Sequence, residues 1–278
     1  MSTTLDLLRI HHVRPLRKYG QSFLTDDQVF LKIVAAGNLK KDDVAVEIGA
    51  GLGVMTAMLA DRVSRVVAVE VDPNLVDILR ENLREKKNVE IVNRDILTYD
   101  FPEADPMTPE RKIKVMGNIP YNITSEILFH LLACRNHVHS AVLLMQKEVA
   151  DRITADPGVK AYGIPTVILS MYADLENLFD VSNRCFYPVP AVQSSVIRLT
   201  FHSAPRYPLK DEEFFRRLVR AAFAQRRKTL LNNLKSFRKI EMSAAGLAAV
   251  LAGLGIDGAR RAESLTLAEF AALSNAFS

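Results

Sequence analysis

An alternation of short apolar runs and helical stretches between residues 44 and about 200 constrains the fold of this chain more than any other feature. Strands are expected at 44–48, 65–71, 89–93, 113–116 and 140–145, where apolar and often β-branched residues cluster. Asp72 and Pro73 are typical of a helix start, as N-cap and first helical residue, and this helix is expected to run to about residue 86. Strands that alternate with helices form parallel βαβ units, so the pattern predicts an α/β fold on a largely parallel sheet.

The pattern changes after the fifth expected strand. Two further strands are expected at 178–181 and 195–201 with no clear helix between them, which predicts a hairpin closing one edge of the sheet. Residues 203–208 include two prolines and are typical of a linker. Apolar spacing then predicts helices over 211–235, 243–253 and 266–276. We therefore expect an α/β domain over residues 1–204 and a small all-helical domain over residues 205–278.

Positive charge is concentrated in two segments. The net charge of the chain is +4, yet residues 1–20 carry +3 and residues 203–240 carry +8, so the remainder is acidic. Such segregation predicts a localised surface for a polyanion such as nucleic acid. A solvated helix face would give a similar local pattern, and charge alone leaves that alternative open.

Several classes of protein are disfavoured. No apolar run approaches the roughly 20 residues of a membrane span, and the N-terminus lacks the compact apolar stretch of a secretory signal, so we expect a cytoplasmic protein without membrane contact. Cys134 and Cys185 are the only cysteines, and neither lies near another Cys or His at zinc-ligand spacing. We therefore expect no metal site.

A glycine-rich turn follows the first expected strand. Gly49, Gly51 and Gly53 alternate with other residues, and Glu47 lies two positions before the first glycine. Glycines allow a tight turn and a close approach of the backbone to a ligand, so the turn is a candidate cofactor site. By itself it also fits a nicotinamide cofactor or a simple tight turn.

Acidic residues end the next two expected strands. Glu70, followed by Val71, lies about 20 residues past the glycines, where a carboxylate can accept hydrogen bonds from ribose hydroxyls. Asp95 can accept from the exocyclic amine of an adenine with Ile96 packed near the ring, although Asp95 also fits a helix or turn cap. The G-x-G-x-G spacing departs from the dehydrogenase fingerprint and looks like the first motif of class I methyltransferases.

The fourth expected strand leads into Asn118, Ile119, Pro120 and Tyr121. An exocyclic amine on a flat aromatic ring is a poor nucleophile, because its lone pair is delocalised. The Asn118 side-chain oxygen and a carbonyl of Ile119 or Pro120 can accept from the two amine hydrogens, while proline stiffens the turn. Tyr121 is placed to stack on a base that has left its own stack. The tetrapeptide therefore predicts an amine-methylating site.

With these motifs the sequence resembles the bacterial small-subunit ribosomal RNA adenine dimethyltransferases, the KsgA family, which has a sister group acting on large-subunit rRNA. The resemblance covers nearly the whole chain. Its matching residues are 18–24, 47–53, Glu70, Asp95, 118–121, 146–149, Phe186, Pro188, Pro190, Val192, Ser194 and Val196. Residues 223–230, 232–234, 254–256 and 261–263 resemble the small-subunit enzymes closely and decide between the sister groups.

The resemblance implies a Rossmann-like class I methyltransferase sheet with a helical C-terminal domain, and S-adenosyl-L-methionine as cofactor. It implies catalytic roles for Asn118, Ile119, Pro120 and Tyr121, with Phe186 as a second stacking wall for the base. The implied cofactor residues are Gln21, Ser22, Leu24, Glu47, Gly49, Gly51, Gly53, Glu70, Val71, Asp95, Ile96 and Asn118. Ser22 departs from the Asn common at its position in the family.

The implied reaction is N6,N6-dimethylation of two adjacent adenines in the 3′-terminal hairpin of 16S rRNA, within a pre-30S particle and by a monomer. RNA contacts are expected from Arg14, Arg17, Lys18, Arg216, Arg220, Arg226, Arg227 and Lys228. Three alternatives remain at this point: a large-subunit rRNA methyltransferase, a non-catalytic assembly or transcription factor on the same fold, and a nicotinamide-dependent oxidoreductase.

Overall fold

The computed structural model of the chain describes residues 3–105, 113–237, 239–240 and 242–278, without the side chain of Arg17. Contacts within the chain divide it into two units. Unit 1 comprises Met1–Ala150 and Glu176–Phe201, and unit 2 comprises Asp151–Leu175 and His202–Ser278. The second boundary lies near the expected linker. The segment Asp151–Leu175 joins the C-terminal helices, because its helix α7 (Ile164–Ser170) packs against α8 (Glu212–Ala222).

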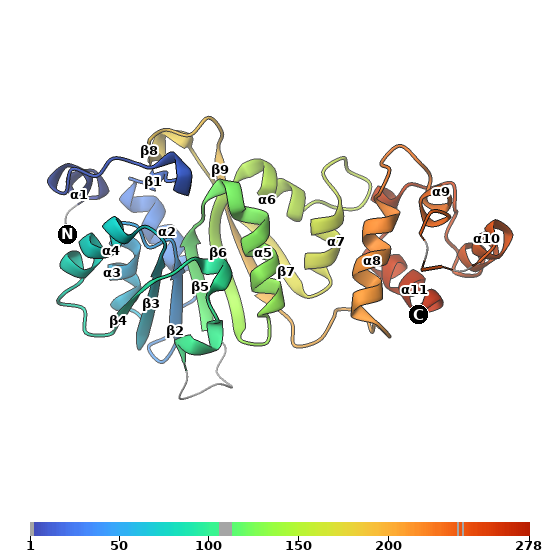
Figure 1. The fold of residues 1–278 in the computed structure, drawn as a ribbon, viewed down its shortest axis with the longest axis horizontal. Coiled ribbons are helices and arrows are strands. Elements are labelled where there is room, and N and C mark those ends of the chain that lie inside the picture. Colours follow the sequence, from blue (N-terminus) through green and yellow to red (C-terminus); the bar gives the residue numbers. More distant parts are fainter. Residues whose placement is uncertain (1–2, 106–112, 238, 241) are drawn as a thin grey trace. The chain divides into compact units, whose positions relative to one another are not determined.

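A seven-stranded sheet in the described residues has the order β4-β3-β2-β5-β6-β9-β7 (Figure 1). The strands are β2 (Val44–Ile48), β3 (Arg65–Glu70), β4 (Val89–Asn93), β5 (Ile113–Asn118), β6 (Val138–Gln146), β7 (Ala173–Val181) and β9 (Ser194–Phe201). The neighbours from β4 to β6 pair in parallel, whereas β9 pairs antiparallel with β6. The expected largely parallel sheet with two further strands at one edge is thus confirmed. Of these two, β9 lies next to β6 and β7 is the edge strand.

The strand order creates a crevice at one end of the sheet. From the central strand β2 the chain moves outward through β3 and β4 and then returns to β5 on the other side of β2. At such a reversal the connections leave the neighbouring carboxyl ends in opposite directions, and open α/β sheets bind ligands there. The glycine-rich turn after β2 and the tetrapeptide at the end of β5 therefore meet at this point.

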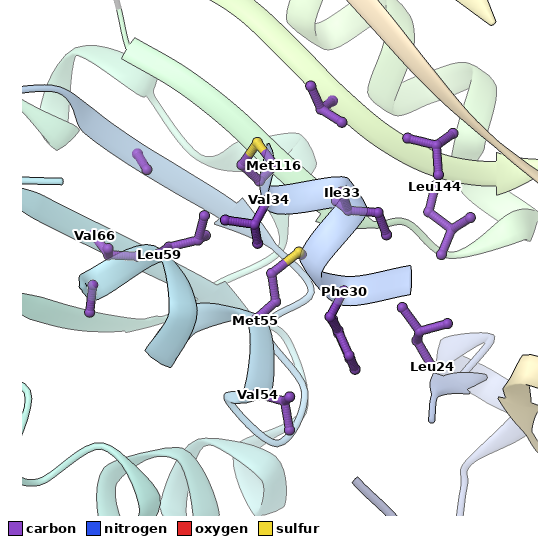
Figure 2. Packing of buried hydrophobic residues seen from close by; sticks show 14 of the residues in the cluster. Leu24, Phe30, Ile33, Val34, Val54, Met55, Leu59, Val66, Met116 and Leu144 are labelled. Atoms are coloured by element: carbon purple, nitrogen blue, oxygen red, sulfur yellow. The ribbon is translucent and has the colours of Figure 1, made fainter. Parts of the chain in front are cut away.

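Helices α2 (Asp27–Ala36) and α3 (Val54–Ala60) cover one face of the sheet. Figure 2 shows their packing: Phe30 and Val34 of α2 and Met55 of α3 meet Met116 of β5 and Leu144 of β6 within one buried cluster. Burial of these side chains fixes α3, and with it the turn that starts α3, against the strands.

Helix α4 (Pro73–Asn82) begins as expected, because the Asp72 side chain accepts from the backbone N–H of Asn74. It ends earlier than residue 86. Residues 84–87 are all charged and offer no apolar side chain to the core, so the helix stops at the buried Leu83, its C-cap. Helix α5 (Thr124–Ala133) follows the tetrapeptide.

Short elements complete unit 1. They are α1 (Thr4–Ile10), η1 (Arg17–Tyr19), β1 (Phe23–Leu24), η2 (Ile96–Thr98), η3 (Phe101–Ala104), η4 (Tyr121–Ile123), α6 (Lys147–Ile153), η5 (Asn183–Cys185) and β8 (Phe186–Tyr187), with α6 extending into unit 2. Strands β1 and β8 pair antiparallel. Leu8 of α1 packs with Phe23, Leu52 and Leu75, so the N-terminal arm lies against the glycine-rich turn.

Unit 2 is helical. Besides α7 and α8 it contains α9 (Leu230–Leu234), α10 (Ala244–Gly253), η6 (Ala262–Ser264) and α11 (Leu267–Phe277). The single helix predicted over 211–235 is wrong, because α8 and α9 are separate. Thr229 caps α9, and the buried Asn233 side chain donates to the carbonyls of Ala222 and Gln225, which replaces the helical hydrogen bonds missing at the break. No helix in the described part of the chain is long and apolar enough to cross a membrane.

Candidate functional site

A cavity opens at the carboxyl ends of β2, β3 and β5, where the strand order reverses. Five segments that are distant in sequence line it: the N-terminal element, the glycine-rich turn, the two acidic strand ends and the tetrapeptide. The lining residues are Tyr19, Gly20, Gln21, Ser22, Phe23, Ile48, Gly49, Gly51, Val69, Glu70, Val71, Leu75, Arg94, Asp95, Ile96, Asn118, Ile119, Pro120, Tyr121 and Ile123. Most residues predicted for cofactor and base therefore meet in one cavity.

Glu70 is held in the cavity wall by two backbone groups. The N–H of Gly51 donates to its Oε2 and the N–H of Asp72 donates to its Oε1, both at 2.9 Å. Gly51 has φ +58°, a left-handed conformation that glycine adopts without strain, and this turns its N–H toward Glu70. Burial raises the pKa of Glu70, and these hydrogen bonds oppose the rise. Each carboxylate oxygen retains lone-pair capacity for a ligand hydroxyl.

Glu47 in β2 and Gly53 at the start of α3 flank the turn but do not line the cavity. Gly53 begins α3 with φ +84°, and a Cβ there would lie 3.0 Å from Leu79 of α4, so this glycine allows the two helices to pack. Glu47 is completely buried behind the turn, beside a separate cavity of about 40 Å³, and its Oε2 has no hydrogen-bond partner among the described residues. Burial, reinforced by the neighbouring Glu70, raises the pKa of Glu47 to about 8.

Asp95 combines the two roles left open by its sequence. Its Oδ1 accepts from the backbone N–H of Leu97 at 3.0 Å, so it caps η2, and its side chain also borders the cavity. The cap fixes the carboxylate while leaving Oδ2 outside this bond. Ile96 is buried beside it and Val71 is exposed, and both line the cavity. The wall here joins an acceptor to an apolar surface, as an adenine ring requires.

The turn that carries the tetrapeptide is fixed by neighbouring backbone groups. Nδ2 of Asn118 donates to the carbonyl of Ser22 at 2.9 Å, so Oδ1 is the side-chain atom outside this bond. The N–H of Ile119 donates to the carbonyl of Leu144 in β6 at 3.1 Å. The carbonyl of Pro120 accepts from the Thr124 hydroxyl at 3.1 Å, at the start of α5. The turn is thus tied to three surrounding elements.

Tyr121 lines the cavity, and its hydroxyl is hydrogen-bonded to a residue outside the cavity wall. The hydroxyl lies 2.6 Å from Oγ of Ser194, the first residue of β9. Burial raises the pKa of the Tyr121 phenol, and the hydrogen bond to Ser194 opposes the rise. The phenol is therefore neutral at physiological pH, and its ring face is the part available to a flat ligand.

The N-terminal element contributes through two side chains. Gln21 donates to Oδ2 of Asp72 at 2.8 Å and accepts from the N–H of Leu16 at 2.7 Å, which ties the arm to the start of α4. Oγ of Ser22 donates to the carbonyl of Pro188 at 3.1 Å. Gln21 and Ser22 line the cavity, whereas Leu24 is buried in the hydrophobic core and does not.

Phe186 lies in the hydrophobic core. Only 2% of it is exposed, it belongs to the same buried cluster as Leu24, and it does not border the cavity. The strand register explains this position, because Phe186 pairs with the buried Leu24 while the exposed Tyr187 pairs with Phe23. This arrangement does not bring Phe186 to the other site residues, and its stacking role stays a prediction.

Some lining residues were not predicted. They are Tyr19, Gly20, Phe23, Ile48, Val69, Leu75, Arg94 and Ile123. Three of them lie within the 18–24 motif, so that motif could have identified them. Leu75 comes from the buried face of α4, which looks like any helix core position in the sequence.

The basic residues expected to contact RNA fall into two groups in unit 2. Arg216 pairs with Glu212 and Glu213 and lies over the Tyr172 ring, and Arg226 pairs with Glu263 and also donates to a main-chain carbonyl. The side chains of these two arginines are therefore engaged by residues of unit 2 itself. The other three, Arg220, Arg227 and Lys228, are exposed and form no ion pair with the residues that the structure describes. In unit 1, Arg14 and Lys18 are exposed, whereas the Arg17 side chain lies outside the described residues.

No group of three or more His, Cys, Asp or Glu side chains within the described residues could hold a metal ion. The polar side chains that line the cavity include instead two carboxylates, two amides and three hydroxyls, from Glu70, Asp95, Gln21, Asn118, Tyr19, Ser22 and Tyr121. Such a set suits hydroxyl and amine groups of a nucleoside.

A family model described as ribosomal RNA adenine dimethylase matches residues 14–277 of this chain. Among curated proteins, the ribosomal RNA small subunit methyltransferase A of Syntrophus aciditrophicus (strain SB) is 46% identical over 278 residues, covering 100% of this chain and 99% of the relative. The protein of the same name from Myxococcus xanthus (strain DK1622) is 42% identical over 276 residues, covering 99% of this chain and 95% of the relative.

Solved structures agree on the fold. The crystal structure of the 23S rRNA methyltransferase ErmE has a TM-score of 0.72 and 28% identity, covering 92% of this chain and 99% of that chain. A dimethyladenosine transferase from Plasmodium falciparum has a TM-score of 0.76 and 23% identity, covering 90% of this chain and 95% of that chain, which bears on the fold alone. The predicted class I methyltransferase fold is confirmed.

Proposed function

The chain belongs to the ribosomal RNA adenine dimethylase family, and from this premise we propose that it dimethylates N6 of two adjacent adenines in the 3′-terminal hairpin of small-subunit rRNA. One observation carries the proposal: the tetrapeptide 118–121 and the pinned carboxylate of Glu70 border the same cavity. The tetrapeptide suits a flat ring with an exocyclic amine, and Glu70 suits a ribose. Two nucleoside-like ligands that meet in one cavity are what methyl transfer from S-adenosyl-L-methionine to adenine requires.

The residues present fit S-adenosyl-L-methionine. Glu70 would accept from the ribose hydroxyls, because both of its oxygens are oriented by backbone N–H groups. Asp95 would accept from the adenine amine with Ile96 against the ring, and the glycine-rich turn would lie along the remaining chain of the cofactor. When bound, the cofactor supplies an electrophilic methyl group on a sulfonium.

Asn118 and a main-chain carbonyl would orient the target amine. The Nδ2 bond to Ser22 leaves Oδ1 of Asn118 as the first acceptor. The Pro120 carbonyl already accepts from the Thr124 hydroxyl and from the N–H of Ile123, which occupies both of its lone pairs, so the carbonyl of Ile119 is the better candidate for the second acceptor. Two acceptors aimed at the amine hydrogens draw the nitrogen toward tetrahedral geometry and localise its lone pair for attack.

No side-chain base is required. Once the nitrogen has bonded to the methyl carbon it carries a positive charge, and its proton becomes acidic enough to pass to water. Tyr121 is not suited to accept that proton, because its raised phenol pKa keeps the hydroxyl protonated and its oxygen is hydrogen-bonded to Ser194. The role that fits Tyr121 is stacking on the base, which must leave the RNA stack to reach the cavity.

The small ribosomal subunit is the better substrate candidate. The full-length relatives at 42% and 46% identity are named as small-subunit enzymes, whereas the 23S enzyme is 28% identical. The exposed Arg14, Lys18, Arg220, Arg227 and Lys228 would contact phosphates of a pre-30S particle. We propose that the chain acts there as a monomer in the cytoplasm.

The test uses purified chain, S-adenosyl-L-methionine with a labelled methyl group, and ribosomal subunits that lack dimethyladenosine. Small and large subunits are incubated separately, and modified positions are mapped by primer extension and nucleoside mass spectrometry. Label in dimethyladenosine of the small-subunit 3′-terminal hairpin is expected. Label confined to the large subunit would show that the chain acts like the sister group, on large-subunit rRNA. Tight cofactor binding and small-subunit binding without any label would indicate a non-catalytic assembly factor.

A further inference from the structure

Ser194 connects strand β9 to the tetrapeptide through a hydrogen bond. It is the first residue of β9, it is fully buried, and its Oγ lies 2.6 Å from the hydroxyl of Tyr121. Tyr121 follows β5, and β6 lies between β5 and β9, so the hydrogen bond spans the carboxyl end of β6. In the same register Ser194 pairs with Gln146, the last residue of β6.

This hydrogen bond fixes the atom of Tyr121 that is farthest from its backbone. Two torsions place a tyrosine ring: χ1 sets the direction of the ring axis and χ2 sets the ring plane. The phenol oxygen lies on that axis, so a hydrogen bond to it restrains χ1 directly. It also restrains χ2, because conjugation of the oxygen with the ring favours hydrogen bonds close to the ring plane. The backbone of Tyr121 is restrained as well, because the Thr124 hydroxyl lies 3.3 Å from its carbonyl. With both ends held, the ring keeps one orientation in the cavity wall before any base arrives.

We propose that Ser194 is a positioning residue for methyl transfer, whose hydroxyl holds the ring of Tyr121 in the plane against which the target base stacks. The inference rests on the proposed function, since it assumes that a flat base occupies the cavity beside Tyr121. Ser194 itself does not line the cavity. Its effect passes through Tyr121, and displacement of a stacking wall misplaces the amine relative to Asn118.

The chain offers a matched control at the next residue. Ser195 lies in the same strand, is equally buried, and donates a hydrogen bond of the same length, 2.6 Å, to Oδ1 of Asp180. Successive residues of a strand point to opposite faces, so the Ser195 side chain points away from Tyr121. A decrease in turnover that came only from removing a buried serine hydroxyl from β9 would affect both serines equally.

The experiment compares Ser194→Ala, Tyr121→Phe, the double variant and Ser195→Ala with the unmodified chain. For each we would measure the unfolding midpoint, the Kd for S-adenosyl-L-methionine, and kcat and KM on small subunits. Ser194→Ala and Tyr121→Phe are each expected to lower kcat by roughly tenfold with cofactor Kd within about twofold. The double variant should be no worse than the less active single variant, because both changes remove one bond. Ser195→Ala should retain kcat.

A second readout does not depend on activity. Ring-labelled tyrosine gives an NMR signal for Tyr121, identified by its disappearance in Tyr121→Phe. Ser194→Ala should shift this signal and accelerate ring flipping, and Ser195→Ala should do neither. An unchanged Tyr121 signal in Ser194→Ala overturns the inference, as do multiplicative decreases of kcat in the double variant. An unmodified chain that labels no small subunit while Tyr121 still responds to Ser194 would instead overturn the proposed function.

Discussion

The side chain of Asn118 donates a hydrogen bond from Nδ2 to the main-chain carbonyl of Ser22, across 2.9 Å. Ser22 in turn donates from its hydroxyl to the carbonyl of Pro188, so hydrogen bonds link the tetrapeptide, the residue before β1 and the residue after β8. An amide rotated by this contact presents its oxygen rather than its nitrogen to the other side. Substitutions at Asn118 can therefore test two roles separately: Oδ1 as the acceptor for the amine, and Nδ2 as the donor that orients the side chain.

Asn118→Ala removes the acceptor, and we expect kcat to fall by roughly 10²- to 10³-fold. Cofactor Kd should change by less than about threefold, since Glu70 and Asp95 supply the main polar contacts expected for the nucleoside. Asn118→Asp should be comparably impaired, because a carboxylate cannot donate to the Ser22 carbonyl. Methyl transfer and calorimetric cofactor binding measure the two effects. Asn122→Ala, at an exposed neighbouring position, is the control, and near-normal turnover in Asn118→Ala would refute the assignment.

Glu70→Gln should weaken cofactor binding without unfolding the chain. An amide can accept with only one atom, so its NH₂ group would oppose one of the two backbone N–H groups, of Gly51 or Asp72, that point at Glu70. We expect the Kd for S-adenosyl-L-methionine to rise about tenfold or more, which corresponds to about 1.4 kcal/mol. Glu90→Gln, on the exposed side of β4, should leave that Kd unchanged. Equal affinities for Glu70→Gln and the unmodified chain would contradict the ribose role.

The sequence predicted the sheet and most of the cavity, because these depend on local patterns. Apolar β-branched runs predict the strands, and polar residues directly after parallel strands converge at one edge of the sheet. The break between α8 and α9 was not predicted. It depends on Asn233 reaching back to Ala222, a contact that spacing alone does not reveal.

Two other outcomes depended on packing. Phe186 and Leu24 are an ordinary pair of apolar residues in sequence, and only the register of β1 with β8 turns both into the core. The Ser194 hydrogen bond with Tyr121 joins residues 73 positions apart and follows from the insertion of β9 beside β6. Phe186 and Ser194 both lie in a segment that resembles the family, yet the resemblance gives neither contact, because each contact depends on how strands distant in sequence align.

Glu47 makes the stability of the chain depend on pH. Its folded pKa is raised to about 8 from an ordinary value of 4.5, chiefly by burial, so the folded state favours the protonated carboxyl. This contribution to stability is fully present below pH 4.5 and is lost as pH rises through 8, with a limiting slope of about 1.4 kcal/mol per pH unit. Glu47→Gln removes the ionisation. Its free energy of unfolding should therefore exceed that of the unmodified chain by more at pH 8.5 than at pH 5.5.

Urea unfolding of both proteins at the two pH values measures the difference. Glu70 also lies near Glu47 and has a raised pKa, so the comparison uses the difference between Glu47→Gln and the unmodified chain rather than either curve alone. Glu90→Gln serves as the control for removing a glutamate charge at the surface. A Glu47→Gln gain that stayed constant between pH 5.5 and 8.5 would show that the buried carboxyl does not titrate in this range.

Substitutions of the basic residues in unit 2 should affect either RNA binding or stability, depending on whether the residue forms an ion pair within the chain. Arg227 and Lys228 are exposed, so their replacement by Glu should weaken small-subunit binding and lower the slope of log K against log salt by about 0.7 to 0.9 for each phosphate that is no longer bound. Arg226 pairs with Glu263, and Arg226→Ala should lower the unfolding midpoint with little change in that slope. Filter binding over a salt series and thermal unfolding give the two quantities.

The double charge reversal leaves the internal pairs of Arg216 and Arg226 intact, so a reduced salt dependence with an unchanged midpoint identifies a binding surface. If the slope instead changed only with Arg226→Ala, the RNA-binding surface would lie at the paired arginine.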